Sequence, residues 1–443
     1  MKEAGRLQRC REPAPAPAQE SASGPASGST PGSTPGSAGR TIRIVTFSTL
    51  FPNAVQPTHG VFVENRLRHL VGSRQVAARV VAPVPWFPSP APAFGRYGAL
   101  ARVPSRETRF GIEIVHPRYP VLPKIGMTMA PFSLYACVKP VLARLIAGGW
   151  DFDLLDAHYF FPDGVAAVML GRALGKPVTI TARGTDINLI PRYRLARRMI
   201  RWAGEHADGL ITVCAALKDE LVRLGIAPER VRVLRNGVDL EMFTPLDRDR
   251  AKAAIGVHGP VLASVGGLIP RKGHDLVIQA LAHLPEVTLL IAGQGPEEGA
   301  LVRLAAASGV AGRVRFLGPI AHERLREIYS AADALVLASS REGWPNVLLE
   351  SMACGTPVIA SRVWGAPEVV TAPEAGLLLR ERSAGAIADA ARALLAAPPP
   401  RAATRAYAER FGWQETSEGQ LALFSRILAS PKPLTATLAC PLP

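Results

Sequence analysis

The 443-residue chain is long enough for two domains with full-sized cores. Its 51 Lys and Arg against 36 Asp and Glu give a formal net charge of +15, which favours an anionic partner: nucleic acid, anionic lipid or a phosphorylated substrate. Few aromatic residues lie among the basic ones, and the sequence has no zinc-finger or RNA-recognition pattern, so nucleic acid is the weakest of these partners.

Cysteine content and hydropathy indicate the cellular compartment of the protein. The 5 Cys are widely scattered with no ligand-like spacing, and we interpret them as free thiols in a reducing compartment. No apolar run reaches the ~18 residues that a membrane-spanning helix needs. The amino terminus lacks the apolar core of a signal peptide. These features predict a cytoplasmic protein, with peripheral contact to the inner face of the cytoplasmic membrane left open.

Both ends of the chain are low in complexity. Residues 1–40 are rich in Gly, Ser, Thr, Pro and Ala, and such a segment buries too little apolar surface to offset the entropy of ordering. We therefore predict a disordered tail at 1–40 and a second loose tail at 431–443. Neither is expected to carry function.

The first predicted domain covers residues 41–243. Its strands are predicted from short runs rich in β-branched residues, at 42–47, 79–82, 112–115, 153–156, 178–181, 210–213 and 232–234. Helical patterns fall between most of these runs, which implies parallel crossovers.

The second predicted domain covers residues 244–410. Its strands are predicted at 261–265, 287–291, 314–317, 334–337, 358–360 and 376–379. Each run ends in a glycine-rich or polar loop, as in a doubly wound sheet. The fold class is therefore α/β, with two Rossmann-type domains that face each other across a ligand-binding cleft.

In the first domain, His158 lies at the carboxyl end of a predicted strand, where it can hydrogen-bond a sugar hydroxyl. Arg183 and Asp186 follow the next strand and are expected to flank the cleft. Gly60 precedes a helix that we expect to begin near Val61, and the amino terminus of that helix is suited to a diphosphate.

Two other features of this domain have competing interpretations. Asp151 and Asp153 flank a single residue, but they precede their strand, so we expect a turn and no metal site. Residues 127–135 are apolar, and residues 192–202 interleave cations with apolar side chains. The two stretches are either a docking surface for anionic lipid or an ordinary core segment and a solvated basic helix.

In the second domain, a cationic loop follows the first strand. Gly267 lets the backbone approach a ligand closely, and Arg271 and Lys272 supply two cations for a diphosphate. The loop that begins at Gly293 is interpreted as a tight turn, because its third glycine is misplaced for a dinucleotide motif. Leu317 lies in a segment that can hold a base through backbone groups and apolar packing.

The most informative motif follows the predicted strand 334–337. Glu342 lies on the loop at the carboxyl end of that strand, where open α/β sheets bind ligands. We expect a helix at 347–354 with Asn346 as its cap and Glu350 about one turn inside. The N–H groups that begin this helix form an anion site. Two hydroxyl-binding carboxylates beside such a site suit a sugar nucleotide.

These motifs resemble those of the family 4 glycosyltransferases of the GT-B fold, also called glycosyltransferase group 1. The resemblance covers about residues 41–428 and is strongest in the E-x7-E pair, Glu342 and Glu350, and in the loop at Arg271 and Lys272. Residues 51–63 are similar, less specifically, to teichuronic-acid-type exopolysaccharide transferases. One departure is that Thr58-His59-Gly60 replaces the usual paired glycines.

The resemblance implies a retaining, metal-independent and cofactor-free transfer from a UDP- or GDP-linked sugar. The acceptor would be a hydroxyl of a glycan or of a lipid-linked molecule in cell-surface polysaccharide biosynthesis. The acceptor hydroxyl would attack the face that the diphosphate leaves, with the departing phosphate as base. A helix at 411–430 would cross back onto the first domain.

The resemblance also implies a role for each site residue. Glu342 would hold donor-sugar hydroxyls, and Glu350 would hold the ribose. Arg271 and Lys272 would neutralise the leaving diphosphate, and His158 would lie by the anomeric carbon. The phosphates would meet Gly60. The sugar and phosphate would be steadied by the run Gly343, Trp344, Pro345, Asn346 and Val347, through the backbone N–H groups of its residues other than proline. The first domain would bind the acceptor and the second domain the nucleotide sugar.

Three alternatives remain at this point. A GT-B sugar-nucleotide epimerase would need cleft acids and bases at the second carbon of the sugar, and the only acidic pair we identify is Glu342 and Glu350. A basic binding module would show salt-sensitive binding without turnover. A phosphorylase would need a lysine suited to an aldehyde cofactor, and none is evident. The sequence leaves the sugar, base, acceptor, linkage and oligomeric state open.

Overall fold

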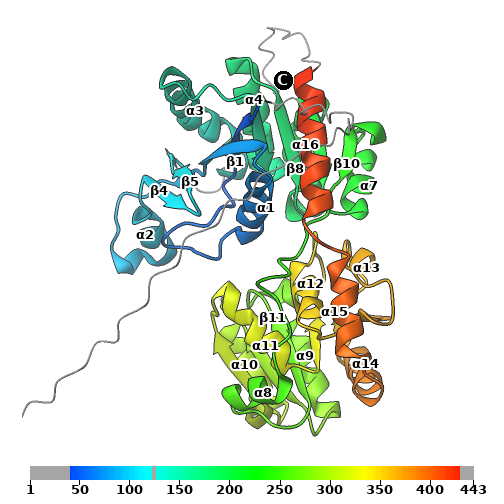
Figure 1. The fold of residues 1–443 in the computed structure, drawn as a ribbon. Helices are drawn as coiled ribbons and strands as arrows, with labels where there is room; N and C mark the ends of the chain where they lie inside the picture. The colour runs from blue at the N-terminus through cyan, green and yellow to red at the C-terminus, as the bar shows by residue number, and fades with distance from the viewer. Residues whose placement is uncertain (1–39, 122–125, 430–443) are drawn as a thin grey trace, which may run out of the picture. The chain divides into compact units, whose positions relative to one another are not determined.

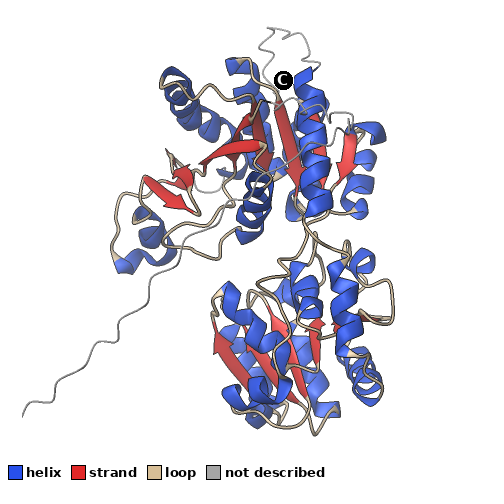
Figure 2. Cartoon of the chain, viewed as in Figure 1, coloured by secondary structure: helices blue, strands red, loops and turns tan. Residues whose placement is uncertain are grey.

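The computed structural model describes residues 40–121 and 126–429. The predicted tails lie outside these residues, except for Arg40. Two central sheets, each flanked by helices, organise the described chain (Figures 1 and 2). This architecture confirms the prediction of two Rossmann-type sheets.

The first sheet has eight strands in the order β10-β9-β8-β7-β1-β2-β5-β4. All neighbours are parallel except β4, which runs antiparallel to β5. A separate parallel pair joins β3 to β6. The strands are β1 Ile42–Phe47, β2 Val76–Val81, β3 Val84–Pro85, β4 Arg106–Arg109, β5 Ile112–Val115, β6 Arg118–Tyr119, β7 Leu154–His158, β8 Val178–Ala182, β9 Gly209–Thr212 and β10 Val231–Val233.

Helices cover both faces of this sheet because side chains alternate along its strands. On β1, Val45 and Phe47 pack with one helix group and Ile44 packs with the other. The first group includes α3 and α4, and the second includes α1 and α16. The helices of this half are α1 Val61–Gly72, α2 Gly95–Ala101, α3 Gly126–Ala147, α4 Val165–Leu174, α5 Thr185–Asn188, α6 Arg194–His206 and α7 Ala215–Arg223.

The second sheet has six parallel strands in the order β13-β12-β11-β14-β15-β16. Its strands are β11 Val261–Val265, β12 Thr288–Ala292, β13 Val314–Gly318, β14 Ala334–Leu337, β15 Val358–Ala360 and β16 Gly376–Leu378. Its helices are α8 Arg248–Ile255, α9 His274–Ala280, α10 Glu298–Ala307, α11 Leu325–Ala331, α12 Asn346–Ala353, α13 Ala366–Val369, α14 Ala384–Ala396 and α15 Arg401–Glu409.

The last helix, α16 Gln414–Ala429, packs against α1 and so returns to the first sheet (Figure 1). Its side chains Leu423 and Phe424 are buried in the same apolar cluster as Ile44. Phe411 and Trp413 precede the helix, so it begins three residues later than predicted.

Helix α3 overturns one expectation from the sequence. It has 22 residues and a mean hydropathy of 1.3, enough by length and composition alone to cross a membrane. Two prolines and two cations interrupt the apolar residues of this helix, so the sequence shows no continuous apolar run of sufficient length there. It rests on the first domain through a stripe of four buried residues, Pro131, Leu134, Val138 and Leu142, while only 22% of its most apolar window is buried.

Candidate functional site

Glu342 is the centre of a charged cluster at the carboxyl end of β14. Its side chain is 8% exposed, and Lys272 Nζ donates to its Oε1 at 2.7 Å. Ser339 Oγ donates to the same oxygen at 2.6 Å, and Arg271 Nη1 lies 3.4 Å from Oε2. Burial alone would raise the pKa of Glu342, but the two cations hold that pKa below its ordinary value. The carboxylate is therefore ionised and fixed at neutral pH.

Glycines allow the loops around this cluster to approach one another. Gly273 has φ 71°, and a Cβ there would lie 2.1 Å from the Ala338 carbonyl oxygen. Gly293 has φ 147°, and its Cβ would lie 1.8 Å from the Gly266 carbonyl oxygen. These contacts bring the Arg271–Lys272 turn to the end of β14. Gly293 is thus needed for a close backbone approach, whereas the turn predicted to begin there lies further on, at residues 296–297.

Glu350 lies inside α12 and is 7% exposed. Tyr329 OH donates to its Oε2 at 2.9 Å, and His322 Nε2 lies 2.9 Å from its Oε1. Burial lowers the pKa of His322, but Glu350 more than offsets this and raises it above the ordinary histidine value. Both oxygens of Glu350 therefore have partners within the protein, and ribose binding stays a prediction.

The run between the two glutamates differs in detail from the predicted cap. Asn346 is the first residue of α12 and makes no side-chain cap, so the prediction of an Asn346 cap is wrong. Its Oδ1 instead accepts from Asn236 Nδ2 at 3.3 Å, and its N–H donates to the Trp344 carbonyl at 3.1 Å. Asn236, on the turn after β10, thus binds the Asn346 side chain that was expected to cap the helix.

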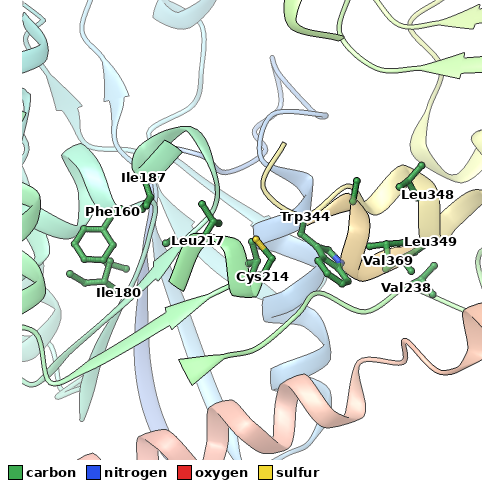
Figure 3. Close-up of a cluster of buried hydrophobic side chains, with 14 of the residues drawn as sticks. Phe160, Ile180, Ile187, Cys214, Leu217, Val238, Trp344, Leu348, Leu349 and Val369 are labelled. Atoms are coloured by element: carbon green, nitrogen blue, oxygen red, sulfur yellow. The ribbon is translucent and has the colours of Figure 1, made fainter. Parts of the chain in front are cut away.

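Trp344 anchors this run to the first domain. It is 6% exposed, and its Nε1 donates to the Asn236 carbonyl at 2.9 Å. Figure 3 shows it in an apolar cluster that includes Leu348 and Val369 on one side and Cys214 and Leu217 on the other. Its side chain therefore packs the core. Contacts between the donor sugar nucleotide and the backbone at Gly343, Pro345 and Val347 stay predictions.

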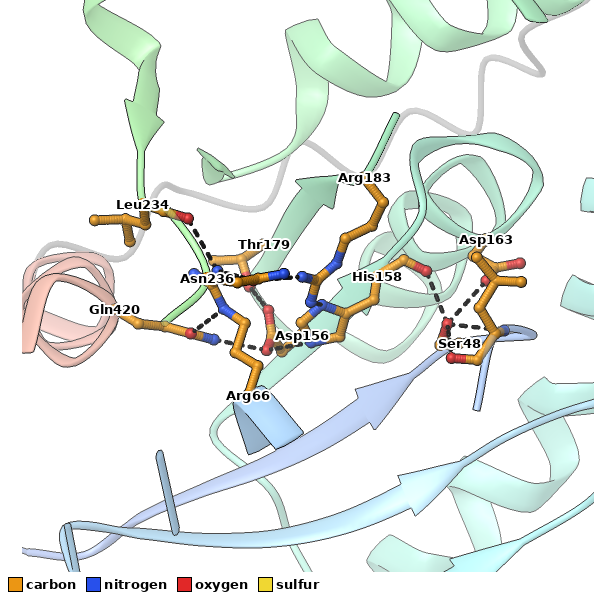
Figure 4. Close-up of polar contacts among 11 residues, drawn as sticks. Ser48, Arg66, Asp156, His158, Asp163, Thr179, Arg183, Leu234, Asn236 and Gln420 are labelled. Carbon is orange, nitrogen blue, oxygen red and sulfur yellow. Dashed lines mark hydrogen bonds and ion pairs between the residues drawn. The ribbon is translucent and has the colours of Figure 1, made fainter. Parts of the chain in front are cut away.

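His158 belongs to a buried polar network in the first domain (Figure 4). Its side chain is 1% exposed, its Nε2 lies 3.1 Å from Asp156 Oδ2, and its Nδ1 contacts Arg183 Nη2. Since arginine can only donate, Nδ1 accepts and Nε2 carries the proton. Burial is the largest cause that lowers the pKa of His158, to about 4, so the ring is neutral. Both ring nitrogens are engaged, and a place at the anomeric carbon stays a prediction.

The network reaches the crossover helix α16. Gln420 Nε2 donates to Asp156 Oδ2 at 2.9 Å, and Gln420 Oε1 accepts from Arg66 Nε at 2.9 Å. Thr179 Oγ1 donates to Asp156 Oδ1 at 2.7 Å. The carboxylate that orients His158 is therefore held from β8 and from α16.

Arg183 joins this network to the Glu342 loop. Its Nη1 donates to Asn236 Oδ1 at 3.1 Å, and its carbonyl oxygen would lie 1.8 Å from a Cβ on Gly343. Asn188 Nδ2 donates to the Glu342 carbonyl at 2.9 Å. The structure thus brings the His158 network, Arg183 and Glu342 into one connected set of contacts.

Several other predicted positions have structural roles. Asp186 is fully buried and accepts from the N–H groups of Phe160, Arg183 and Gly184, so the expectation that it flanks an open cleft is wrong. Gly60 has φ 72°, and a Cβ there would lie 2.3 Å from the Leu50 carbonyl oxygen. Its glycine is thus required by packing within the domain, and contact with phosphate stays a prediction.

Gly267 and Leu317 follow or end parallel strands of the second sheet, β11 and β13, so they lie at the same carboxyl edge as Glu342. Asp151 pairs with Lys176, and Asp153 pairs with Arg40. Among the described residues, no group of three or more His, Cys, Asp or Glu side chains is placed to hold a metal ion.

Sequence reasoning missed several members of the site: Arg66, Asn188, Asn236, His322, Tyr329, Ser339 and Gln420. Asn236 had a usable signal, because it opens an Asn-Gly turn directly after a predicted strand. Gln420 had none, since its partner Asp156 is 264 residues away in sequence.

Comparison with known proteins decides the family. The model for glycosyl transferases group 1 matches residues 247–411, and the model for glycosyltransferase family 4 matches residues 60–242. A D-inositol 3-phosphate glycosyltransferase of Mycobacteroides abscessus is 35% identical over 322 residues, which cover 68% of this chain and 72% of that protein. The Mycobacterium tuberculosis H37Ra protein of the same name is 37% identical over 323 residues, 67% of each chain.

The chain belongs to the family 4 glycosyltransferases. Solved structures show the GT-B fold. Sucrose-phosphate synthase from Thermosynechococcus elongatus matches with a TM-score of 0.72 and 21% identity, over 88% of this chain and 99% of that one. Anabaena HepE in complex with UDP-glucose matches with a TM-score of 0.66 and 19% identity, over 87% of this chain and all of HepE.

Membership of this glycosyltransferase family fixes the general activity. The protein is an enzyme that transfers a sugar from a nucleotide sugar to an acceptor. The two relatives described above are both named D-inositol 3-phosphate glycosyltransferase. They give no specific support to the narrower likeness to teichuronic-acid-type transferases.

Proposed function

We propose that this glycosyltransferase moves a sugar from a UDP- or GDP-linked donor to a hydroxyl acceptor, with retention at the anomeric carbon and without a metal or other cofactor. One observation carries the proposal: the ionised Glu342 lies between Lys272 and Arg271 beside the start of α12. Carboxylate, cations and helix N–H groups at one place match the hydroxyls and the diphosphate of such a donor.

The reaction develops opposite charges on the two halves of the donor. As the bond from the anomeric carbon to the phosphate oxygen breaks, negative charge grows on the β-phosphate and positive charge grows on the sugar ring. Lys272 and Arg271 would stabilise the phosphate, a contribution of several kcal/mol in a site that excludes water. Glu342 would bind sugar hydroxyls and oppose the ring charge.

The same-face path needs no protein nucleophile. The acceptor oxygen bonds to the anomeric carbon on the face that the diphosphate leaves, and the hydroxyl proton passes to the departing phosphate. The partners of Glu342 support this path over a double displacement, because two cations and Ser339 already hold its oxygens. A neutral His158 is likewise a weak candidate for the base, since Arg183 occupies its accepting nitrogen.

For the acceptor we propose a glycan or lipid-linked molecule in cell-surface polysaccharide biosynthesis, used in the cytoplasm at the inner face of the membrane. A phosphorylated polyol is a second candidate, favoured by relatives named for inositol 3-phosphate.

A donor and acceptor screen tests the proposal. UDP and GDP sugars are incubated with lipid-linked sugar acceptors, with inositol phosphate, and with no acceptor. We expect a glycosidic product whose anomeric configuration, read by proton NMR coupling, equals that of the donor. An inverted product would reject retention, and an epimerised donor without acceptor would favour the epimerase.

A further inference from the structure

Exposed apolar side chains gather on one part of the first domain. Ten large hydrophobic residues of the described chain are exposed, and seven of them belong to three segments of that domain, at 86–97, 121–129 and 193. We call these seven the apolar rim. Its members are Trp86, Phe94, Tyr97, Val121, Met127, Met129 and Tyr193, each between 40% and 56% exposed. Scattered single residues of this kind need no explanation, but a cluster marks an interaction surface.

Topology places the rim at the carboxyl edge of the first sheet, the edge that carries His158. Two residues separate the end of β2 from the start of β3, and the Trp86 N–H donates to the Tyr119 carbonyl at 2.8 Å, beyond the strand ends. Helix α3 leads into the start of β7, so its own start, with Met127 and Met129, lies at the carboxyl edge. Tyr193 precedes α6, which follows β8 and therefore begins at the same edge.

The helices behind the rim lie on one face of the sheet. Both α3 and α6 pack against α4, so the exposed sides of α3 and α6 lie on the same face of the sheet as α4. The outward side of α3 is mainly apolar, with Lys139 and Arg144 as its charges. Figure 1 shows α3 at the periphery of the domain.

Helix α6 supplies charge and not apolar contact. Its apolar residues Met199, Ile200 and Ala203 are buried against the domain, so it cannot insert them elsewhere. Its exposed side chains are mainly cationic: Arg194, Arg197, Arg198 and Arg201, with Arg192 just before the helix. Glu205 and His206 near the end of the helix are also exposed, and Glu205 pairs with Arg201. Of the two interpretations of residues 192–202, the structure thus retains the cations for contact with anionic headgroups, while the apolar side chains of the helix pack in the core.

Charge distribution identifies the partner. The segment 84–147, which carries six of the seven rim residues, has eight Lys and Arg against two Asp and Glu. Both acids are paired, Glu107 with His116 and Glu113 with Arg79. Of the cations, Arg109 pairs with Glu64, but the segment keeps a net excess of positive charge. An apolar surface beside such an excess of cations complements a bilayer with anionic headgroups.

We propose that the apolar rim and the cationic face of α6 dock this domain on an anionic lipid bilayer. The rim side chains enter the interface, and the arginines contact headgroup phosphates. Because both lie at the edge that carries the site, docking presents the site to the headgroup of a lipid-linked acceptor. This last step rests on the proposed acceptor, whereas docking itself does not.

Vesicle sedimentation of the full-length protein tests the docking. We use vesicles of phosphatidylcholine alone and vesicles with phosphatidylglycerol added. We expect binding that is at least tenfold stronger to the anionic vesicles and that weakens as salt is raised. The double variants Trp86→Ser/Tyr193→Ser and Met127→Asp/Met129→Asp should each weaken binding to anionic vesicles at least fivefold. Arg194→Glu/Arg198→Glu should remove the preference for phosphatidylglycerol.

Val302→Asp is the matched control, because Val302 is 47% exposed on α10 and stands apart from the rim. It should bind like the wild type. No binding by the wild type, or wild-type binding by both rim variants, would overturn the proposal. So would light scattering that shows the rim variants converting a dimer to monomers with vesicle binding unchanged. Transfer to a water-soluble acceptor is assayed in parallel, so that failure of docking and failure of sugar transfer are separate results.

Discussion

At the scale of single residues, the pair of Lys272 and Glu342 is the most sensitive point of the site. Lys272→Ala removes the 2.7 Å ion pair and one of two cations for the leaving diphosphate. We expect kcat to fall by about 10²- to 10³-fold with the fold intact. Glu342→Gln should lower kcat similarly, since the amide keeps the shape but not the charge.

The matched control is Lys252→Ala, which removes a 2.8 Å ion pair with Asp333 near the start of β11, at the opposite edge of the second sheet. Its kcat should equal that of the wild type. Steady-state kinetics and circular dichroism of the purified variants decide the matter. Near-normal turnover in both Lys272→Ala and Glu342→Gln would refute the assignment.

His158 gives a prediction about pH. Because its pKa is lowered to about 4 in the folded protein, the unfolded chain takes up a proton near pH 6.5 and the folded protein does not. Stability from this residue is therefore complete above pH 6.5 and is lost as the pH falls toward 4. The loss is at most about 3 kcal/mol. Urea unfolding between pH 4.5 and 7.5 should show a steeper loss for the wild type than for His158→Gln. If the free energy of unfolding fell equally steeply with pH in both proteins, a neutral buried His158 would be contradicted.

At the scale of elements, the contact between the loop after β8 and the loop after β14 allows no side chain at Gly343. A Cβ there would lie 1.8 Å from the Arg183 carbonyl oxygen, a backbone atom that cannot rotate away as a side chain could. Gly343→Ala should therefore separate the loops, lower stability by about 1–3 kcal/mol and lower kcat/KM at least tenfold. Gly385→Ala is the control, because nothing lies within 4 Å of its added Cβ. Unchanged kinetics in Gly343→Ala would show that the contact does not matter for turnover.

The crossover helix α16 is held to the first sheet by a buried hydrogen-bonded side chain. Gln420→Ala leaves Asp156 and Arg66 each without one partner, at a cost of about 1–3 kcal/mol. Gln414→Ala, on the exposed face of the same helix, should cost far less because its partner Glu418 is in solvent. Thermal unfolding compares them, and an equal effect of the two variants would argue against the buried network.

Local pattern predicted the elements well where apolar runs were short and buried. Strands β11, β14 and β15 have the predicted bounds because each is a fully buried parallel strand. Strands β3, β4 and β6 were missed, since two have only two residues and β4 is a charged edge strand. The Asn346 cap failed because a partner 110 residues away, Asn236, competes for the side chain.

At the scale of the whole molecule, the predicted parts of the site differ in how they are assembled. Glu342 lies on the loop after β14, and the cations Arg271 and Lys272 lie on the loop after β11. These two strands are parallel neighbours, so topology alone brings the two loops together. The contacts of Arg183 and Gln420 join different domains or the far end of the chain. No single-sequence pattern reports such pairs, so the charged cluster was predictable and its supports were not.

Nucleotide binding in the absence of a metal ion tests whether side chains of the protein neutralise the diphosphate. If Lys272 and Arg271 supply the positive charge for the diphosphate, UDP or GDP should raise the unfolding temperature in the presence of a chelator. At a nucleotide concentration of 100 Kd the stabilisation is about 2.7 kcal/mol. Lys272→Ala should lose most of that shift, whereas Lys252→Ala should keep it. A shift that requires added Mg²⁺ in the wild type would mean that an ion, and not these side chains, neutralises the diphosphate.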